Sequence, residues 1–407
     1  HKDYKFNNFE FSWLYIQKIF NRAIILSMSK RDVNDDYNSE LLTYREELNA
    51  LHPYTPGTSV DALQQKHNLK HIIKLSSNEN PLGSAVLPQE LQTCLEQCSI
   101  YPDVNHHPLI PLIAQTCDVT HSQCIVTNGS DEIFSLVAQA YLNAGDHVLS
   151  TQYTFSVYKS VTTIMGAHYK SVKDNNYQTS LQHLLDAITK RTKLIFIANP
   201  NNPTGTFINH QDIAAFMTKV PKHVLVILDE AYKEYVIHEE INSNLHLLQS
   251  FDNLIITRTF SKIYGLAGLR IGFGLASNHV IAALQKVRPP FNVNQVALQA
   301  AYIALRDKQA FVDTSKKLTQ SGLNQYKVAC KDWPVTFIES AANFICLILH
   351  HHTGKDIYQF MIKHGVIIRN LASFGLDNAV RITVSTANEN TKSIDLLNLF
   401  FKTKSND

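Results

Sequence analysis

Short apolar runs recur along the chain, and segments with the apolar spacing of amphipathic helices lie between them. The runs that predict strands cover residues 122–127, 147–150, 193–198, 223–228 and 253–257. The segments that predict helices cover residues 132–142, 157–165 and 181–188. Almost wholly apolar runs separated by helices are typical of a parallel sheet that is buried on both faces. The pattern therefore predicts a large, doubly wound, mostly parallel α/β domain over residues 76–288.

The pattern changes after Pro289-Pro290, which predicts a domain boundary. A long helical segment follows, at residues 295–324, and a last helix is predicted at residues 391–402. Between them, the runs that predict strands cover residues 334–338, 343–349, 366–369 and 380–384. We therefore expect a smaller α+β domain over residues 289–407.

The N-terminal part of the chain precedes both predicted domains. We expect residues 51–75 to form an arm that packs near the smaller domain, and residues 1–50 to form an extension. Residues 11–28 are mildly apolar but carry Lys18, Asn21 and Arg22, which disfavours a secretory signal. Met28 is the expected natural start, so residues 1–27 are expected to be non-native.

Composition restricts the classes of function. The 407 residues are 44% hydrophobic and 18% charged, with a formal net charge of +2. These values are ordinary for a soluble globular protein, and they provide no global field for nucleic acid or an anionic membrane. No apolar run approaches the roughly 20 residues of a membrane span. The six cysteines form no C-x-x-C pair, so we expect free thiols in a reducing cytoplasm and no metal site.

Polar residues follow the ends of predicted strands. Residues 199–206 (Asn-Pro-Asn-Asn-Pro-Thr-Gly-Thr) come directly after a buried run, and Asn202 is placed to donate its amide to a ligand oxygen. Open α/β sheets bind ligands at this edge, although a plain loop is the alternative. Asp229 closes the next run, where a partly desolvated carboxylate needs a cationic partner. A pyridinium nitrogen is one such partner, and a nearby Lys or Arg is the other.

Lys262 follows the third of these strands, in the string Thr259-Phe260-Ser261-Lys262. Partial desolvation of a lysine there favours the neutral amine that forms a Schiff base, whereas an exposed lysine is the alternative. Arg270, eight residues on, can reach back to a phosphate, as can the hydroxyls of Thr259 and Ser261.

A fourth string, residues 127–131 (Thr-Asn-Gly-Ser-Asp), joins a strand to a helix. Exposed N–H groups at a helix start bind phosphate, and Gly129 lets the backbone approach closely. Ser130 and Asp131 are also ordinary helix caps, so this string supports the others without deciding the function alone.

In this order and context, Asn202, Asp229, Lys262 and Arg270 resemble the fold-type-I pyridoxal-phosphate-dependent enzymes. The finer resemblance is to the histidinol-phosphate aminotransferases, over about residues 51–401. It is carried by the strings at residues 53–57 (Pro-Tyr-Thr-Pro-Gly), 74–83 (Lys-Leu-Ser-Ser-Asn-Glu-Asn-Pro-Leu-Gly), 101–103 (Tyr-Pro-Asp), 288–294 (Arg-Pro-Pro-Phe-Asn-Val-Asn) and 381–384 (Arg-Ile-Thr-Val).

The resemblance implies pyridoxal 5'-phosphate as cofactor and a role for each matching residue. Lys262 would hold the cofactor covalently, and Asp229 would pair with the pyridine nitrogen. Asn202 and Tyr232 would bond its phenolic oxygen. Phe155 would stack on the ring, with an ordinary core aromatic as the alternative. The phosphate cup would consist of Ser130, Asp131, Thr259, Ser261 and Arg270, with Tyr54 reaching in from the partner subunit of a homodimer.

The same resemblance implies the substrate. Arg381 matches an arginine that grips the substrate's anionic end, and Arg369 and Asn80 are further candidates. A surface salt bridge is the alternative for Arg369. The implied reaction is transamination of L-histidinol phosphate with 2-oxoglutarate, giving imidazole acetol phosphate and glutamate in histidine biosynthesis.

Three alternatives remain from the sequence. An aromatic (phenylalanine or tyrosine) aminotransferase and a threonine-phosphate decarboxylase would keep the cofactor and change the substrate. A pyridoxal-phosphate-binding transcriptional regulator would need a winged helix-turn-helix domain before the large domain, and residues 1–50 are too few for one.

Overall fold

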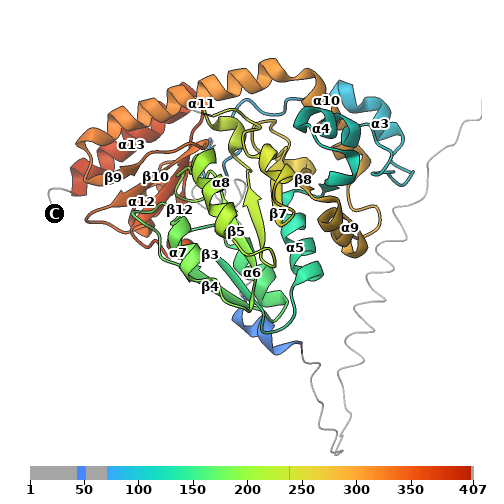
Figure 1. The fold of residues 1–407 in the computed structure, drawn as a ribbon. Coiled ribbons are helices and arrows are strands. Elements are labelled where there is room, and N and C mark those ends of the chain that lie inside the picture. The colour runs from blue at the N-terminus through green and yellow to red at the C-terminus, as the bar shows by residue number, and fades with distance from the viewer. Residues whose placement is uncertain (1–43, 52–70, 238, 405–407) are drawn as a thin grey trace, which may run out of the picture. The chain divides into compact units, whose positions relative to one another are not determined.

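A seven-stranded sheet forms the centre of the larger part of the fold (Figure 1). The structure is a computed structural model that describes residues 44–51, 71–237 and 239–404. The strand order is β2-β8-β7-β6-β5-β3-β4, and only β8 runs antiparallel to its neighbours. In chain order, the strands are β2 Cys124–Thr127, β3 His147–Thr151, β4 His168–Val172, β5 Thr192–Ala198, β6 Leu225–Asp229, β7 Leu254–Thr259 and β8 Gly272–Ala276.

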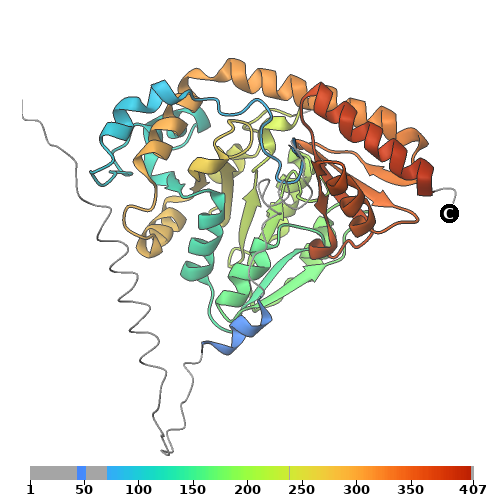
Figure 2. The same ribbon diagram turned by 180° about the vertical axis from the view of Figure 1, so that it is seen from behind.

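Helices cover both faces of this sheet, as the apolar runs predict (Figures 1 and 2). One face packs on α5 (Ser130–Tyr141), α6 (Val157–Ile164) and α9 (Asn278–Val287). The other packs on α4 (Leu109–Cys117), α7 (Leu181–Asp186), α8 (His210–Lys219) and α10 (Gln295–Asp307). The predicted fold class, a doubly wound and mostly parallel α/β sheet, is therefore confirmed.

Strand β8 was not predicted, because its glycines hide the apolar pattern. A Cβ on Gly272 would lie 2.6 Å from the backbone nitrogen of Ser130, and one on Gly274 would lie 3.0 Å from Cδ1 of Ile133. Only glycine therefore lets α5 begin so close to the strand. This close approach brings the start of α5 to the edge of the sheet where the polar strings end.

A smaller, antiparallel sheet of four strands has the order β12-β13-β10-β9. Its core is shared with a two-stranded parallel sheet formed by β1 and β11, and includes Leu75. The strands are β1 Ile73–Lys74, β9 Val335–Ile338, β10 Phe344–Leu349, β11 Val366–Ile367, β12 Arg369–Asn370 and β13 Ala379–Thr383. The helices around this core are α11 (Gln309–Ala329), α12 (Gly354–Lys363) and α13 (Ala387–Lys404).

Two element predictions in this region need correction. The single helix predicted over residues 295–324 is two helices, because Lys308 leaves the helical conformation at φ −109° and ψ 30°. The strand predicted over residues 366–369 splits into β11 and β12, which belong to different sheets. At each break, the chain passes from one group of packed elements to another.

The break at Lys308 also bears on the domain boundary. Helix α10 buries Ala297, Leu298 and Ala301 in the core of the large sheet, whereas α11 buries Tyr326 in the core of the smaller sheets. We therefore propose that the boundary falls at Lys308, one helix later than the predicted division at residues 288 and 289.

The remaining elements are short. They are α3 (Gln92–Glu96) and the 3₁₀ helices Glu46–Ala50, Pro88–Leu91, His121–Gln123, Lys233–Tyr235, Leu245–Gln249, Ala267–Leu269, Cys330–Asp332 and Ala372–Phe374.

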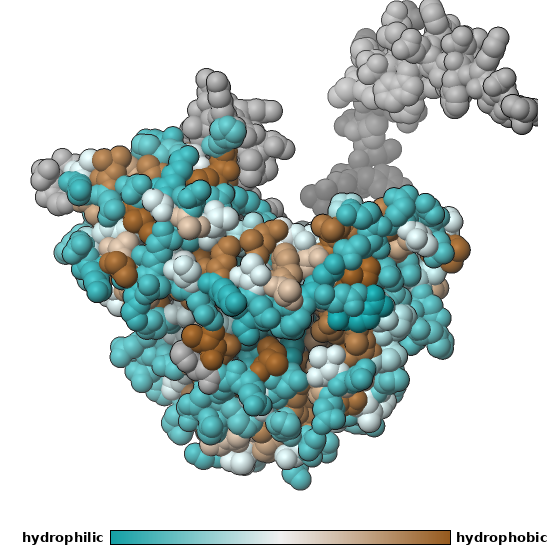
Figure 3. All heavy atoms as spheres, turned by 90° about the horizontal axis from the view of Figure 1, so that it is seen from above, coloured by the Kyte–Doolittle hydropathy of each residue, from teal (hydrophilic) through white to brown (hydrophobic). Residues whose placement is uncertain are grey.

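The surface and the thiols agree with the composition. Hydrophobic residues on the face seen from above are interspersed with hydrophilic ones (Figure 3). Within the described part of the chain, no helix combines the length and the apolar character needed to cross a membrane. All six cysteines are free thiols, and only Cys98 is exposed.

Candidate active site

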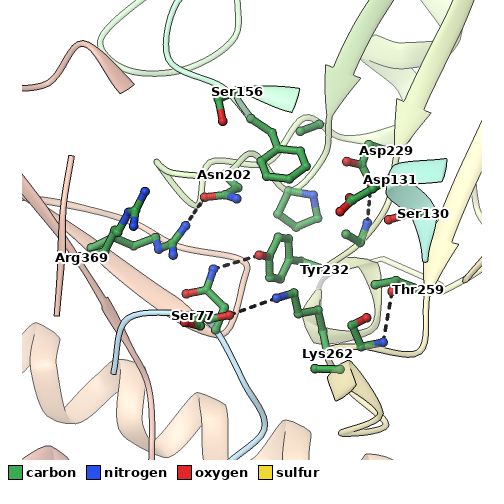
Figure 4. A pocket seen from close by; sticks show the side chains of 18 of the residues that line it. Ser77, Ser130, Asp131, Ser156, Asn202, Asp229, Tyr232, Thr259, Lys262 and Arg369 are labelled. Atoms are coloured by element: carbon green, nitrogen blue, oxygen red, sulfur yellow. Dashed lines mark hydrogen bonds between the residues drawn. The ribbon is translucent and has the colours of Figure 1, made fainter. Parts of the chain in front are cut away.

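A cavity of about 220 Å³ lies at the carboxyl-terminal edge of the large sheet, where β5, β6 and β7 end. Parallel strands bring their carboxyl ends to one edge, so residues far apart in sequence meet there. The smaller sheet completes the wall with Arg369 and Arg381 (Figure 4). The predicted residues that line the cavity are Ser130, Asp131, Phe155, Asn202, Asp229, Tyr232, Thr259, Ser261, Lys262, Arg270, Arg369 and Arg381.

Asp229 ends β6 and is only 6% exposed. Its Oδ2 accepts a hydrogen bond from the Tyr158 hydroxyl at 2.6 Å, and its Oδ1 accepts from Thr257 at 3.2 Å. Burial raises the pKa of the Asp229 carboxyl to about 6, although the Tyr158 hydrogen bond lowers it. No lysine or arginine among the described residues forms an ion pair with it, so the carboxylate fits a cationic ligand group such as a protonated pyridine nitrogen.

Lys262 follows β7 and projects into the cavity between Tyr232 and Ser77 (Figure 4). Its Nζ donates a hydrogen bond to the Ser77 carbonyl at 3.1 Å and lies 5.7 Å from the centroid of the Tyr232 ring. The described carboxylates form no ion pair with this amine. The lysine is therefore positioned to react with a ligand.

One end of the cavity has the donors of an anion site. Ser130 begins α5, whose first backbone N–H groups have no partner within the helix. Gly129 precedes it at φ +80°, and a Cβ there would lie 2.6 Å from Nη2 of Arg270. Arg270 donates to the Ser261 hydroxyl at 3.3 Å, and its Nη2 lies 3.5 Å from Asp131. This combination of a helix start, a hydroxyl and a guanidinium fits a phosphate group.

Two arginines from neighbouring strands lie at the other end. Arg369 on β12 and Arg381 on β13 are directly opposite each other in the register of the small sheet. Arg381 is 5% exposed and donates to the Ser76 carbonyl at 2.8 Å. The side chain of the half-buried Arg369 makes no hydrogen bond or ion pair with any described residue, so the surface salt bridge considered for it does not occur there.

Asn202 lies between the two ends of the cavity (Figure 4). Its Oδ1 accepts a hydrogen bond from Arg381. The amide nitrogen is therefore the group that remains able to donate to a ligand oxygen.

The prediction for Asn80 was wrong, and that for Tyr54 falls outside the described residues. Asn80 does not line the cavity, since its amide donates to the Ile263 carbonyl at 2.8 Å and to Ser315 at 2.9 Å. Asn78 lines it instead and donates to the Tyr232 hydroxyl at 2.9 Å. Both asparagines stand in one string, and Asn78 has a positive φ of 56°, which Asn80 does not share.

Sequence reasoning also missed Tyr158, the hydrogen-bond donor to Asp229. It stands three residues after Phe155, and their rings meet edge to face at 5.8 Å between centroids. Phe155 precedes α6, which begins at Val157, so no helical spacing links the two residues, and only their closeness in sequence indicates a shared site.

Comparisons with known proteins agree with this arrangement. The family model for aminotransferase class I and II matches residues 70–397. The histidinol-phosphate aminotransferase 2 of Pseudomonas fluorescens is 41% identical over 352 residues, which cover 85% of this chain and 94% of that relative. The histidinol-phosphate aminotransferase of Anoxybacillus flavithermus is 36% identical over 359 residues, covering 88% of this chain and 96% of that relative.

A solved structure shows the same fold. The histidinol-phosphate aminotransferase from Sinorhizobium meliloti, in complex with pyridoxal-5'-phosphate, has a TM-score of 0.77 at 24% identity. The match covers 88% of this chain and 96% of that one. These matches confirm the resemblance that the motifs indicated, and the chain belongs to the class I and II aminotransferase family.

Proposed function

We propose that this protein transfers the amino group of L-histidinol phosphate to 2-oxoglutarate, using pyridoxal 5'-phosphate and forming imidazole acetol phosphate and glutamate in histidine biosynthesis. The observation that carries the proposal is a lysine inside a cavity with cationic groups at both ends. In Figure 4, Lys262 lies between Arg369 on one side and Ser130 and Thr259 on the other, and Arg270 and Arg381 line the same cavity. The names of the most similar relatives support the choice of substrate.

The cavity offers a partner to each part of the cofactor. Asp229 would hold the pyridine nitrogen in its protonated form, while Asn202 and Tyr232 would donate to the phenolic oxygen. Phe155, which also lines the cavity, would pack on the ring. When bound, pyridoxal phosphate supplies an electron sink for the bond broken at the substrate's α-carbon. The phosphate would be held by Ser130, Asp131, Thr259, Ser261 and Arg270, all of which line the cavity.

Lys262 is the group that moves the proton. With the cofactor bound, its Nζ would take the proton from the substrate's α-carbon as a general base and deliver it to the cofactor's C4′ atom as a general acid. Tyr232, whose hydroxyl accepts from Asn78, lies beside this amine and helps to orient it. Arg369 and Arg381 hold the anionic end of the donor, because a planar guanidinium matches phosphate and carboxylate alike.

The two arginines are expected to differ when each is replaced by alanine. Arg369→Ala should raise the KM for histidinol phosphate by about 10- to 100-fold with little change in Tm, because Arg369 has no described partner to lose. Arg381→Ala should raise the KM and also lower the Tm, because it leaves the Ser76 carbonyl and Asn202 without their donor. Steady-state kinetics and thermal unfolding of both variants check this, and equal Tm losses would contradict it.

The substrate is tested by a single half-reaction. Protein loaded with pyridoxal phosphate is mixed with histidinol phosphate, and in parallel with phenylalanine, while the absorbance of the bound cofactor is followed. We expect rapid bleaching with histidinol phosphate alone. Preferential bleaching by phenylalanine would indicate an aromatic aminotransferase, and release of carbon dioxide from threonine phosphate would indicate the decarboxylase. Absence of a bound-cofactor band would contradict the cofactor itself.

We also propose a homodimer in the cytoplasm. The resemblance supports the dimer, in which the partner subunit's Tyr54 would reach the phosphate. Free, mostly buried thiols support a reducing compartment. Sedimentation of the active enzyme as a monomer would contradict the first part, and cell fractionation tests the second.

A further inference from the structure

Tyr158 is held rigidly behind the cavity. It lies in the first turn of α6 and is fully buried. Its ring stacks on Phe196, with 4.6 Å between centroids and 6° between planes. The edges of Phe134 and Phe155 also contact it, at 5.1 and 5.8 Å between centroids. With aromatic rings on several sides, the phenol cannot turn, so the position of its hydroxyl is fixed.

The hydroxyl is directed at one carboxylate oxygen. It donates to Oδ2 of Asp229 at 2.6 Å, while Oδ1 accepts from the Thr257 hydroxyl and from the Ala231 backbone N–H, both at 3.2 Å. Burial raises the pKa of Tyr158 well above its usual value, so the hydroxyl stays a donor. The carboxylate is therefore fixed in orientation by donors from α6, from β7 and from the turn that follows β6.

This contact also affects the basicity of the carboxylate. Burial and the nearby Asp131 raise the pKa of Asp229, and the hydrogen bond from Tyr158 lowers it. The titratable groups around the pair are Asp131 on α5 and Tyr169 on β4, with Lys262 and Arg270 facing Asp131. A carboxylate that loses its strongest donor holds a proton more tightly.

Resting on the proposed function, we infer that Tyr158 is a positioning residue for the cofactor: by fixing and stabilising the charged form of Asp229, it keeps the proton on the pyridine nitrogen. Without its hydroxyl, Asp229 becomes a stronger base and draws that proton away from the ring. The ring is then a weaker electron acceptor, so the rate falls while substrate contacts stay unchanged. Packing alone does not require the hydroxyl, because phenylalanine would fill the same space.

The test follows the proton directly. Wild type and Tyr158→Phe are loaded with pyridoxal phosphate labelled with ¹⁵N in the ring, and the ring-nitrogen NMR signal is recorded. We expect the wild-type signal at the protonated position and the variant signal displaced toward the unprotonated one. In parallel, kcat of Tyr158→Phe should fall about tenfold with KM for histidinol phosphate within about twofold of wild type.

Two further variants separate this role from a structural one. Thr257→Val removes the weaker donor to Asp229 and should displace the ¹⁵N signal less, in the same direction; it also carries the test if Tyr158→Phe fails to fold. Tyr326→Phe removes another fully buried phenol hydroxyl, in the core of the smaller sheets, and should leave the signal unchanged.

The outcomes remain distinguishable. Identical ¹⁵N signals in wild type and Tyr158→Phe would overturn the inference even if kcat fell, since a fall alone is what a packing defect gives. A wild type that does not bind the labelled cofactor would overturn the proposed function, and this inference with it.

Discussion

Turnover is expected to vanish when Lys262 is replaced by alanine. A general acid–base group contributes about 10² to 10⁴ in rate, and the covalent role of the same amine adds to that. The fold should survive, because this side chain makes one described hydrogen bond, to the Ser77 carbonyl. Steady-state assays with histidinol phosphate and 2-oxoglutarate measure the loss, and thermal unfolding measures the stability.

Lys286→Ala provides the matched control, since Lys286 is an exposed lysine on α9. It should keep wild-type turnover. Substantial steady-state activity in Lys262→Ala would remove Lys262 from the proposed role, whereas equal loss in both variants would point to a preparation defect.

Three of the residues found from sequence share one property: each stands at or shortly after the end of a buried strand. Asp229 is the last residue of β6, whereas Asn202 and Lys262 follow β5 and β7, and the carboxyl ends of parallel strands meet at one edge. An apolar run therefore predicts not only the strand but also where the next polar side chain lies. For these residues, a position after an apolar run in the sequence is also a position at the binding edge of the sheet.

Where the sequence pattern does not determine the position in the fold, the sequence-based predictions failed. Asn78 and Asn80 stand two residues apart in one string, and only Asn78, whose φ is positive, is among the residues that line the cavity. In the sequence, Tyr158 resembles an ordinary core aromatic residue. Only the 2.6 Å hydrogen bond from its hydroxyl identifies Asp229 as its partner. Strand β8 was hidden by glycines that are required by the close approach of α5. Each failure concerns a direction or a distance that composition and spacing do not encode.

Asp229 is expected to act in opposite directions on stability and on activity. Its pKa is about 6 in the fold, against a usual value of 3.8, so the folded state favours the protonated form. An acid whose pKa is raised by folding stabilises the folded state at pH values below its pKa in the unfolded chain. This contribution is lost as the pH rises through its pKa in the folded state. The apoprotein should therefore lose stability between about pH 4 and about pH 6 on account of this carboxyl, by roughly 3 kcal/mol.

Asp229→Asn removes this titration and should reverse the effect in the apoprotein. Relative to wild type, the variant should gain up to about 3 kcal/mol in free energy of unfolding between about pH 4 and about pH 8. Denaturant unfolding of both apoproteins at the two pH values measures the difference, and other titrating groups cancel in the comparison. A constant difference across the range would show that Asp229 is not the buried acid that the structure describes.

The same substitution should cost most of the activity. A neutral amide cannot hold the pyridine nitrogen in its charged form, and loss of one partner of a buried ion pair costs about 3–5 kcal/mol, or about 10² to 5 × 10³ in kcat/KM. Added pyridoxal phosphate should raise the Tm of wild type more than that of Asp229→Asn, because only the carboxylate gains a cationic partner. Asp229 therefore destabilises the apoprotein, but it gains a cationic partner when the cofactor is bound. A variant that is more stable than wild type as apoprotein and yet nearly inactive would show this trade-off between stability and activity.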